Sequence, residues 1–274
     1  AYVWVQIPKL EGTNTAVWAF WDNGSADRPA YATNGATWAQ NFAAVWHALS
    51  PTNASELPDS APGRHPGSAS GVGDAPGLIG NALSFSGATV SVPPAALDSV
   101  TNEITISLWQ YGTVHDAWCS AFEGVSNGLR VLNAHIPWGS LIFWDAGIDV
   151  NDTFQPFDRY YKECTSANQW CGQWNHWVFT KNAASGVQNI YLNGAYWGGR
   201  TRAIRPMVGI TAFNIGSGVG WGYYNGLIDE FRIQNVAQTP DWIQATYLNQ
   251  KAGSTFATYG AVNKQFFGTL LIFR

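Results

Sequence analysis

The sequence has few charged residues, and neither sign dominates. Asp, Glu, Lys and Arg make up 12% of the 274 residues, with 18 acidic against 14 basic side chains. Nucleic-acid-binding proteins concentrate Lys and Arg in a patch or a stripe, which this composition does not supply. The charge balance therefore argues against a nucleic-acid partner.

Long apolar segments and several common catalytic motifs are also missing. No run of eighteen or more apolar residues occurs, so the sequence predicts no membrane-spanning helix. The motifs GxSxG and HExxH and the phosphate-binding P-loop are absent, which disfavours serine hydrolases, zincins and nucleotide-binding enzymes. Residues 1–4 have the pattern of a strand rather than of a signal peptide, so we expect a mature product or a piece of a longer exported chain.

Only three cysteines are present, Cys119, Cys164 and Cys171. The last two bracket the polar segment CTSANQWC, which is typical of a local disulfide in an exported protein. We predict a disulfide between Cys164 and Cys171, with Cys119 left as a small apolar residue buried in a strand. A zinc site is the alternative, but no CxxC or HxxxH spacing accompanies these cysteines, which disfavours it.

Glycine and tryptophan are abundant instead. The chain has 29 Gly and 15 Trp against one Met, which favours short strands and tight turns over helices. Short alternating segments follow one another from residue 81 onward: NALSFSG, ATVSVP, EITISLWQYG, WCSAFEG, LRVLNAHIP, SLIFWDAG, NHWVFTK, QNIYLNG, GITAFNIGS and LIDEFRIQN. We expect an all-β sandwich of two antiparallel sheets, with tight turns at Asn193-Gly194 and Asn225-Gly226.

Two segments depart from this strand pattern. Residues 50–80 are dominated by Pro, Gly, Ser and Ala, so an irregular loop is predicted there. A loop of this length needs an ion or close packing to hold it. After the last strand, Thr239, Pro240 and Asp241 supply the start of a helix, so one short helix is predicted through WIQATYLNQ.

Several separated segments resemble known families. They are GLIGNALSFSG, ITISLWQY, QWNHWVFTKN with QNIYLNGAYW, and YYNGLIDEFRIQNVAQTPDWIQATYLNQ. Their order and spacing resemble the laminin-G-like members of the concanavalin-A-like lectin/glucanase family. The resemblance covers residues 46–252 and implies a jelly-roll sandwich, which we expect to form a domain over residues 46–274. The segments VWVQIPKLEG, VWAFWDNGSAD and AAVWHAL resemble the C-terminal part of a bacterial domain of unknown function found upstream of such modules, so residues 1–45 are expected to pack on the sandwich or to extend it.

The same resemblance implies one structural calcium ion. Asp59 in LPDSAPG and Asp229 in GLIDEF stand at the matching positions, and carboxylate and carbonyl oxygens are the ligands that a hard divalent cation requires. The alternative is that Asp229 and Glu230 cap a strand end or pair with Arg232 at the surface.

Aromatic and polar residues gather between residues 109 and 178. Sugars stack their C–H faces on flat aromatic rings and bind short polar side chains through their hydroxyls. We predict a secreted or cell-surface module that binds a polysaccharide through His135, Trp138, Trp144, Asp145, Arg159, Trp170, Trp174 and Trp221. The alternative is that the aromatic side chains fill the sandwich core, as we expect for Trp109 and Trp177.

Two further hypotheses remain open. A polysaccharide-degrading enzyme, either a glycoside hydrolase or a lyase, would use Asp145, His135 and Glu123. The ExDxxE strand motif of laminarinase-like families and any lyase motif are absent. A structural adhesion or spacer domain is the third hypothesis. The apolar tail KQFFGTLLIFR is expected to pair with the sandwich or with the N-terminal segment, because an exposed apolar edge would aggregate.

Overall fold

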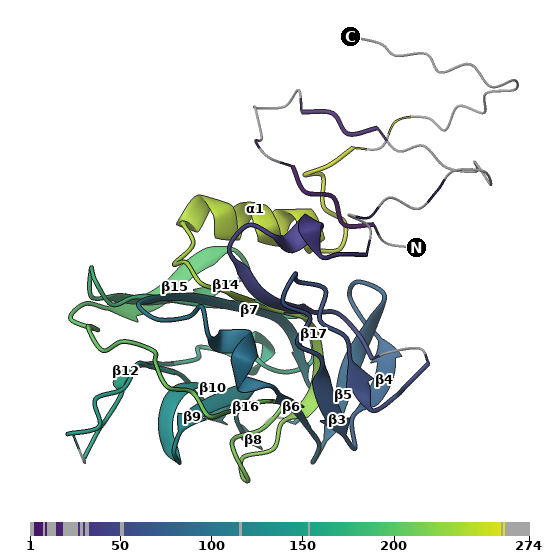
Figure 1. Cartoon of the computed structure of the whole chain (residues 1–274). Helices are drawn as coiled ribbons and strands as arrows, with labels where there is room; N and C mark the ends of the chain where they lie inside the picture. The colour runs from purple at the N-terminus through teal and green to yellow at the C-terminus, as the bar shows by residue number, and fades with distance from the viewer. Residues whose placement is uncertain are drawn as a thin grey trace, which may run out of the picture.

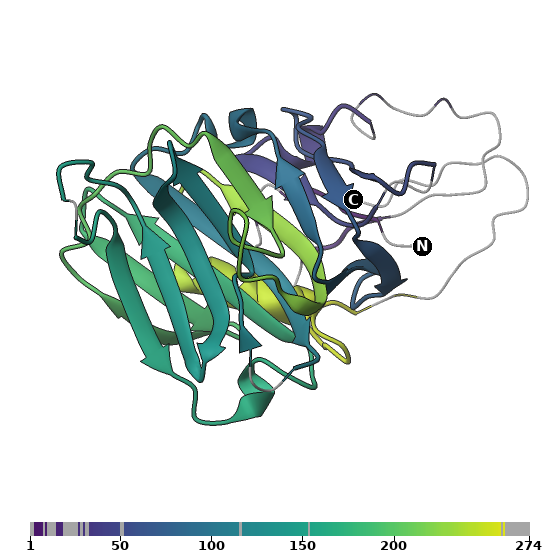
Figure 2. The ribbon, with the colours of Figure 1, turned by 90° about the horizontal axis from the view of Figure 1, so that it is seen from below.

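Two antiparallel sheets pack face to face in the computed structural model of the chain (Figures 1 and 2). The structure describes residues 3–7, 9, 15–18, 27, 30, 33–49, 52–114, 117–152, 154–258 and 260. The predicted all-β sandwich of two antiparallel sheets is confirmed. No helix among the described residues is long and apolar enough to cross a membrane.

The eight-stranded sheet forms the upper layer in Figure 1. Its strands are β1 (Phe42–Trp46), β4 (Gly73–Pro76), β5 (Asn81–Ser86), β7 (Glu103–Gly112), β13 (Asn175–Asn182), β14 (Val187–Leu192), β15 (Ala195–Arg200) and β17 (Asn225–Gln234). Their order is β15-β14-β13-β7-β17-β5-β4, and β1 also pairs with β17.

The nine-stranded sheet forms the lower layer, and Figure 2 shows it from its outer side. Its strands are β2 (Glu56–Leu57), β3 (Gly67–Ser70), β6 (Thr89–Val92), β8 (Ala117–Trp118), β9 (Phe122–Ser126), β10 (Leu129–Gly139), β11 (Leu141–Ala146), β12 (Asp158–Glu163) and β16 (Ala212–Ile215). Their order is β12-β11-β10-β9-β16-β6-β3-β2, and β8 also pairs with β10.

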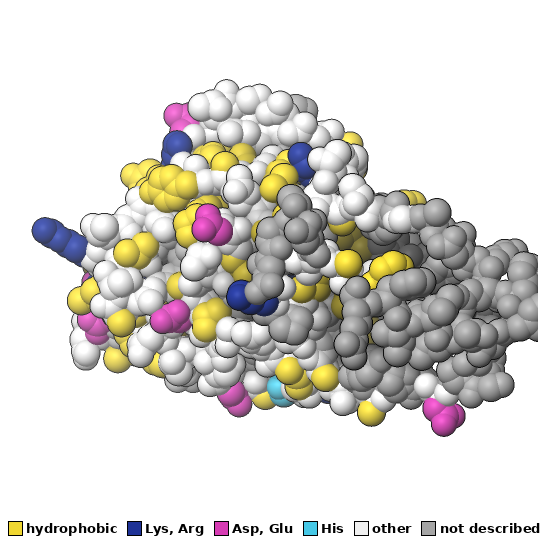
Figure 3. All heavy atoms as spheres, turned by 90° about the horizontal axis from the view of Figure 1, so that it is seen from above, with side chains coloured by type: hydrophobic (Ala, Val, Ile, Leu, Met, Phe, Trp, Pro, Cys, Tyr) yellow, Lys and Arg dark blue, Asp and Glu magenta, His cyan; other side chains and the backbone are white. Residues whose placement is uncertain are grey.

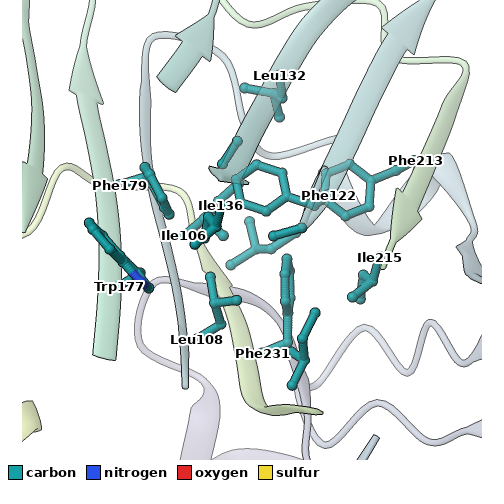
Figure 4. Packing of buried hydrophobic residues seen from close by; sticks show 14 of the residues in the cluster. Ile106, Leu108, Phe122, Leu132, Ile136, Trp177, Phe179, Phe213, Ile215 and Phe231 are labelled. Atoms are coloured by element: carbon teal, nitrogen blue, oxygen red, sulfur yellow. The ribbon is translucent and has the colours of Figure 1, made fainter. Parts of the chain in front are cut away.

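The core lies between the two sheets and contains large aromatic side chains (Figure 4). Phe122 of β9 is one of them, with its ring centroid 5.6 Å from that of Phe231 and 5.8 Å from that of Phe179, both on the other sheet. On β10, Leu132 and Ile136 are fully buried in this core. Because successive side chains of a strand point to opposite faces, His135 lies on the outer face of the sheet.

Helix α1 (Pro240–Gln250) covers the outer face of the eight-stranded sheet (Figure 1). It begins as predicted, because the Thr239 side chain accepts a hydrogen bond from the Trp242 N–H. Ile243 packs against Val178 and Tyr191 of the sheet below. On this side of the molecule, charged side chains stand singly among hydrophobic and uncharged polar ones (Figure 3).

Of three local predictions, one is confirmed and two are wrong. Asn193 and Gly194 have φ angles of 52° and 79° and form the predicted turn between β14 and β15. Asn225 and Gly226 form no turn, because both lie inside β17 and pair with β5. The segment 50–80 is also less irregular than predicted, since it contains β2, β3 and β4.

The described part of the N-terminal segment contacts the eight-stranded sheet. β1 pairs with β17, so that Trp46 lies opposite Phe231. The ring of Trp4 lies 5.4 Å from that of Trp38, and its face is covered by the Arg232 guanidinium at 4.4 Å. The division of the chain at residues 45 and 46 stays a prediction, and the apolar tail 264–274 lies outside the described residues.

The predicted disulfide is not formed, because all three cysteines are free and buried in the structure. The reason lies in their different backbone partners. The Cys164 N–H donates to Ser140 O beside the nine-stranded sheet, whereas Cys171 bridges to Gly112 of the eight-stranded sheet. Burial raises the pKa of Cys164 and of Cys119 to about 12, which keeps both thiols protonated.

Candidate functional site

A row of polar side chains crosses the outer face of the nine-stranded sheet. Five neighbouring strands place directly opposed residues along this row: Asn214, Glu123, Asn133, Asp145 and Arg159. Opposed residues on adjacent antiparallel strands point to the same face of a sheet. Strand pairing therefore brings together polar groups that lie up to 91 positions apart in the sequence, from 123 to 214.

Two carboxylates of this row are buried and neutralised by two arginines. Arg130 Nε lies 2.9 Å from Glu123 Oε1, and Arg130 Nη1 lies 2.7 Å from Asp145 Oδ2. Arg159 donates to both Asp145 oxygens, at 2.7 Å each. The carboxylate side chains are only 3% and 0% exposed. Burial, the largest single influence, lowers the pKa of Arg159, but the hydrogen bonds to Asp145 and the charges of Asp145 and Tyr161 together hold this pKa above its usual value.

Aromatic side chains lie beside the polar row on the same face. His135, Phe143 and Tyr161 are directly opposed on β10, β11 and β12, with ring centroids 5.4 and 5.1 Å apart. The Trp138 ring lies 4.7 Å from that of His135. The Trp221 ring approaches from the glycine-rich loop 216–222 and lies 5.6 Å from the same histidine.

Several of these groups line an open hollow of about 250 Å³, which we call the sheet cavity. It is lined by Arg130, His135, Trp138, Phe143, Arg159 and Trp221. The rings of Trp138 and Trp221 meet at 78°, with centroids 5.7 Å apart, and so form two nearly perpendicular walls. The Arg130 guanidinium lies over the Trp221 ring at 5.3 Å, which orders the loop side of the cavity.

His135 is held in one orientation and one protonation state. Its Nδ1 lies 3.0 Å from the Cys119 carbonyl oxygen and 3.2 Å from Ser120 Oγ. A carbonyl oxygen can only accept, so we assign the proton to Nδ1 and a free lone pair to Nε2. Burial, with a smaller contribution from Arg130, lowers the pKa of His135 to about 4, so the ring is neutral near pH 7.

The structure brings together some of the predicted ligand contacts. His135, Trp138, Arg159 and Trp221 line the sheet cavity, and Asp145 lies beneath it as the shared partner of both arginines.

The remaining predicted contacts lie elsewhere, contrary to the sequence-based prediction. Trp144 has no exposed surface, because it packs in the core and donates its indole N–H to Thr180 O. Trp170 is also a core residue, at 7% exposure. Trp174 is half-buried beside Tyr111, at an end of the eight-stranded sheet, and does not line the cavity.

Sequence reasoning missed Arg130, which binds both buried carboxylates. The strict alternation of β10 would turn Arg130 toward the core, because Leu132 and Ala134 point there. The pairing of β10 with β9 shifts register between Arg130 and Leu132, and this bulge turns the arginine outward. Trp118 was also missed; it is 60% exposed, and its ring lies 5.2 Å from that of Trp138 at the rim of the cavity.

A larger hollow of about 460 Å³ lies near the loops 149–158 and 200–205. Among the described residues, its lining consists of charged and polar side chains and one isoleucine, with no aromatic ring. Arg205 pairs with Asp152 there at 2.7 Å, and the buried Lys181 pairs with Asp158 at 2.8 Å. This hollow offers no stacking surface, so the sheet cavity is the better candidate for a sugar.

The two acids predicted to bind calcium fit that role unequally. Asp59 accepts hydrogen bonds from three backbone N–H groups, those of Val45, Ala61 and His65, and this occupies both of its oxygens. Asp229 accepts from the Ile79 N–H through Oδ2, but its buried Oδ1 has no hydrogen-bond partner in the described part of the chain. Asp59 therefore already uses both oxygens on backbone N–H groups, whereas Asp229 keeps one free oxygen. Calcium stays a prediction.

A family model described as the concanavalin A-like lectin/glucanases superfamily (Laminin_G_3) matches residues 85–244. No curated protein was found to match the chain. The resemblance of residues 1–45 to an upstream bacterial domain stays a prediction.

Solved structures share the fold at low sequence identity. The botulinum neurotoxin serotype G binding domain has a TM-score of 0.60 at 14% identity, over 77% of this chain and 51% of that one. Domain 4 of AbnA, a GH43 extracellular arabinanase from Geobacillus stearothermophilus solved with arabinotriose, has a TM-score of 0.55 at 20% identity, over 74% of this chain and 97% of that one. The botulinum neurotoxin serotype D ligand binding domain, solved with N-acetylneuraminic acid, has a TM-score of 0.60 at 13% identity, over 80% and 52%. This chain thus spans about half the length of the neurotoxin domains.

Proposed function

This chain belongs to the concanavalin A-like lectin/glucanase superfamily, and we propose that it is a carbohydrate-binding module whose ligand enters the sheet cavity. We further propose that it works outside the cell, as part of a larger exported protein, and that its natural ligand is a polysaccharide. The arabinanase domain of similar fold, which comes from an extracellular enzyme and was solved with arabinotriose, supports this proposal.

The observation that carries the proposal is the composition of the sheet cavity. Two tryptophan rings form perpendicular walls, which suits the C–H faces of a sugar ring. Guanidinium groups and a neutral imidazole line the same space and can bind hydroxyls. A concave site that combines apolar walls with a few convergent polar groups is the usual form of a small-ligand site.

The same geometry does not favour a glycoside hydrolase. Hydrolysis of this kind needs one protonated carboxylic acid and a second carboxylate that is free to act. Glu123 and Asp145 are both bound to arginines, and Glu123 Oε2 also accepts the Val219 N–H at 2.7 Å. Both carboxylates are thus engaged by arginines, so neither is free to take the second role.

Affinity electrophoresis against a panel of polysaccharides tests the proposal. We expect some polysaccharides to retard the wild-type chain, and we expect Trp221→Ala and Trp138→Ala to weaken binding at least tenfold, or about 1.4 kcal/mol. The matched control is Tyr196→Ala, which removes an aromatic ring that is 62% exposed on β15 of the other sheet.

Three results would contradict the proposal. The first is the absence of retardation by every polysaccharide, which would favour the spacer hypothesis. The second is equal weakening in the Tyr196→Ala control. The third is release of reducing ends or unsaturated products by the wild type but not by Asp145→Ala, which would favour an enzyme.

A further inference from the structure

His135, Arg130 and Arg159 supply hydrogen-bonding groups to the lining of the sheet cavity, beside the indole N–H groups of Trp138 and Trp221. His135 Nε2 is an acceptor, because Nδ1 carries the ring proton. Arg130 uses Nε and Nη1 on the two carboxylates, and Arg159 uses Nε and Nη2 on Asp145. Arg130 Nη2 and Arg159 Nη1 make no hydrogen bond within the described residues, so both remain available as donors.

The charges around the cavity balance. The two guanidinium groups carry two positive charges, and Glu123 and Asp145 beneath them carry two negative ones. His135 adds no charge near pH 7, since burial lowers its pKa to about 4. A ligand carboxylate or sulfate could accept from the free N–H groups, but it would bring an uncompensated negative charge beside two buried carboxylates. A hydroxyl adds no charge, and it can donate to a nitrogen lone pair and accept from an N–H at once.

The size of the cavity limits the ligand. Its volume of about 250 Å³ lies below the roughly 300–1,000 Å³ of sites that hold drug-sized molecules. Trp138 and Trp221 form two walls that meet at 78°, and Phe143 also belongs to the lining. An extended chain would need an open groove with parallel stacking surfaces, whereas a corner accepts one ring.

From these observations we propose that the sheet cavity binds a single neutral sugar unit, with one hydroxyl donating to His135 Nε2 and accepting from the free N–H groups of Arg130 or Arg159. This inference rests on the proposed function and adds the ligand class and the number of sugar units. The rest of a polysaccharide would then lie outside the cavity, toward the exposed rim residue Trp118.

Two sets of probes test this proposal with the wild-type chain. Affinity gels contain either neutral polysaccharides (arabinan, galactan, xylan, laminarin) or anionic ones (polygalacturonate, alginate, chondroitin sulfate). Free arabinose, galactose, xylose and glucose, and their trisaccharides, then compete for the gel-bound ligand. We expect retention by at least one neutral polymer, and we expect the matching monosaccharide to compete within about tenfold of its trisaccharide.

The outcomes separate this inference from the proposed function. Retention only by anionic polymers would overturn the neutral ligand class and leave carbohydrate binding intact. Competition by trisaccharides with monosaccharides more than a hundredfold weaker would overturn the single-unit site. No retention by any polymer would overturn the proposed function and this inference with it.

Monodeoxy derivatives of the competing monosaccharide test the assigned hydrogen bond. One derivative should bind wild type at least tenfold more weakly than the parent sugar, because it leaves His135 Nε2 without its hydroxyl. His135→Phe keeps a ring in place but removes this acceptor, so it should bind that derivative and the parent sugar with equal affinity. A loss that persists in His135→Phe would overturn the assigned contact. If the variant fails to fold, the monodeoxy derivatives still test the contact on the wild-type chain. The contact would also be overturned if no derivative bound wild type at least tenfold more weakly than the parent sugar.

Discussion

At the scale of single residues, the buried neutral state of His135 makes stability depend on pH. Its pKa in the folded chain is about 4, below the ordinary value of 6.5. The unfolded chain therefore takes up the proton at a higher pH, so the stabilisation is complete above pH 6.5 and is lost as the pH falls toward 4. As the pH falls from 6.5 to about 5, we expect protonation of His135 in the unfolded chain to lower the free energy of unfolding by about 1.5 kcal/mol.

Urea unfolding curves at several pH values measure this effect. As the pH falls from 6.5 to about 5, the free energy of unfolding of the His135→Gln variant should decrease by about 1.5 kcal/mol less than that of wild type, because Gln does not titrate. Parallel pH profiles for the two proteins would show that the histidine is not held neutral by the fold.

Two tryptophans show which site residues the sequence could predict and which it could not. Trp144 and Asp145 are neighbours on β11, so they must point to opposite faces, and both cannot contact one ligand. Alternation alone would therefore have removed Trp144 from the site once Asp145 was placed outside. Trp221 is different, because its position over Arg130 depends on how the loop 216–222 closes across β10. No local pattern encodes that closure.

At the scale of elements, the loop 216–222 carries Trp221 to the cavity and depends on its glycines. Gly216 and Gly220 both have left-handed φ angles, 80° and 83°. A Cβ on Gly216 would lie 2.1 Å from the Phe85 ring, whereas a Cβ on Gly220 would meet nothing within 4 Å. Gly220→Ala should cost only the backbone term of about 1–2 kcal/mol. Gly216→Ala should cost about 1–3 kcal/mol more, because it overpacks the core.

Guanidinium unfolding of the two variants, side by side, measures this difference. Gly220→Ala is the matched control, since it shares the backbone cost and lacks the clash. Equal destabilisation of the two variants would mean that Phe85 can move aside without cost.

Four strands that the sequence patterns missed lie at sheet edges, and β3, which was also missed, lies next to an edge. β2 and β12 end the nine-stranded sheet, and β4 and β15 end the eight-stranded one. An edge strand has one neighbour and less buried surface, so its sequence need not alternate apolar with polar residues. The segment DRYYKE of β12 shows this, with mostly half-buried or exposed side chains. Central strands such as β7 and β13 bury nearly all of their residues, and both were predicted.

At the scale of the whole molecule, the predicted calcium site rests on the carboxylate of Asp229. This carboxylate lies on β17 in the middle of the eight-stranded sheet, where Gly77 passes so close that a Cβ there would lie 2.7 Å from Oδ2. Burial raises the pKa of Asp229 to about 7. Ionisation without a partner for Oδ1 therefore costs free energy, which a cation bound there would offset.

We propose that calcium binds at Asp229 and stabilises the fold by joining the segment 77–80 to the sheet. Calcium at a hundredfold excess over its Kd would add about 2.7 kcal/mol, which corresponds to a Tm rise of about 5 °C or more over the same protein in chelator. Asp229→Asn should abolish this rise, because the amide loses the charge. Asp59→Asn should keep the calcium-dependent Tm rise, even if this substitution lowers the Tm in both buffers. The reason is that the Asp59 oxygens accept hydrogen bonds from backbone N–H groups. Equal Tm values for wild type in calcium and in chelator, or a rise that survives in Asp229→Asn, would show that the free oxygen of Asp229 does not hold a cation.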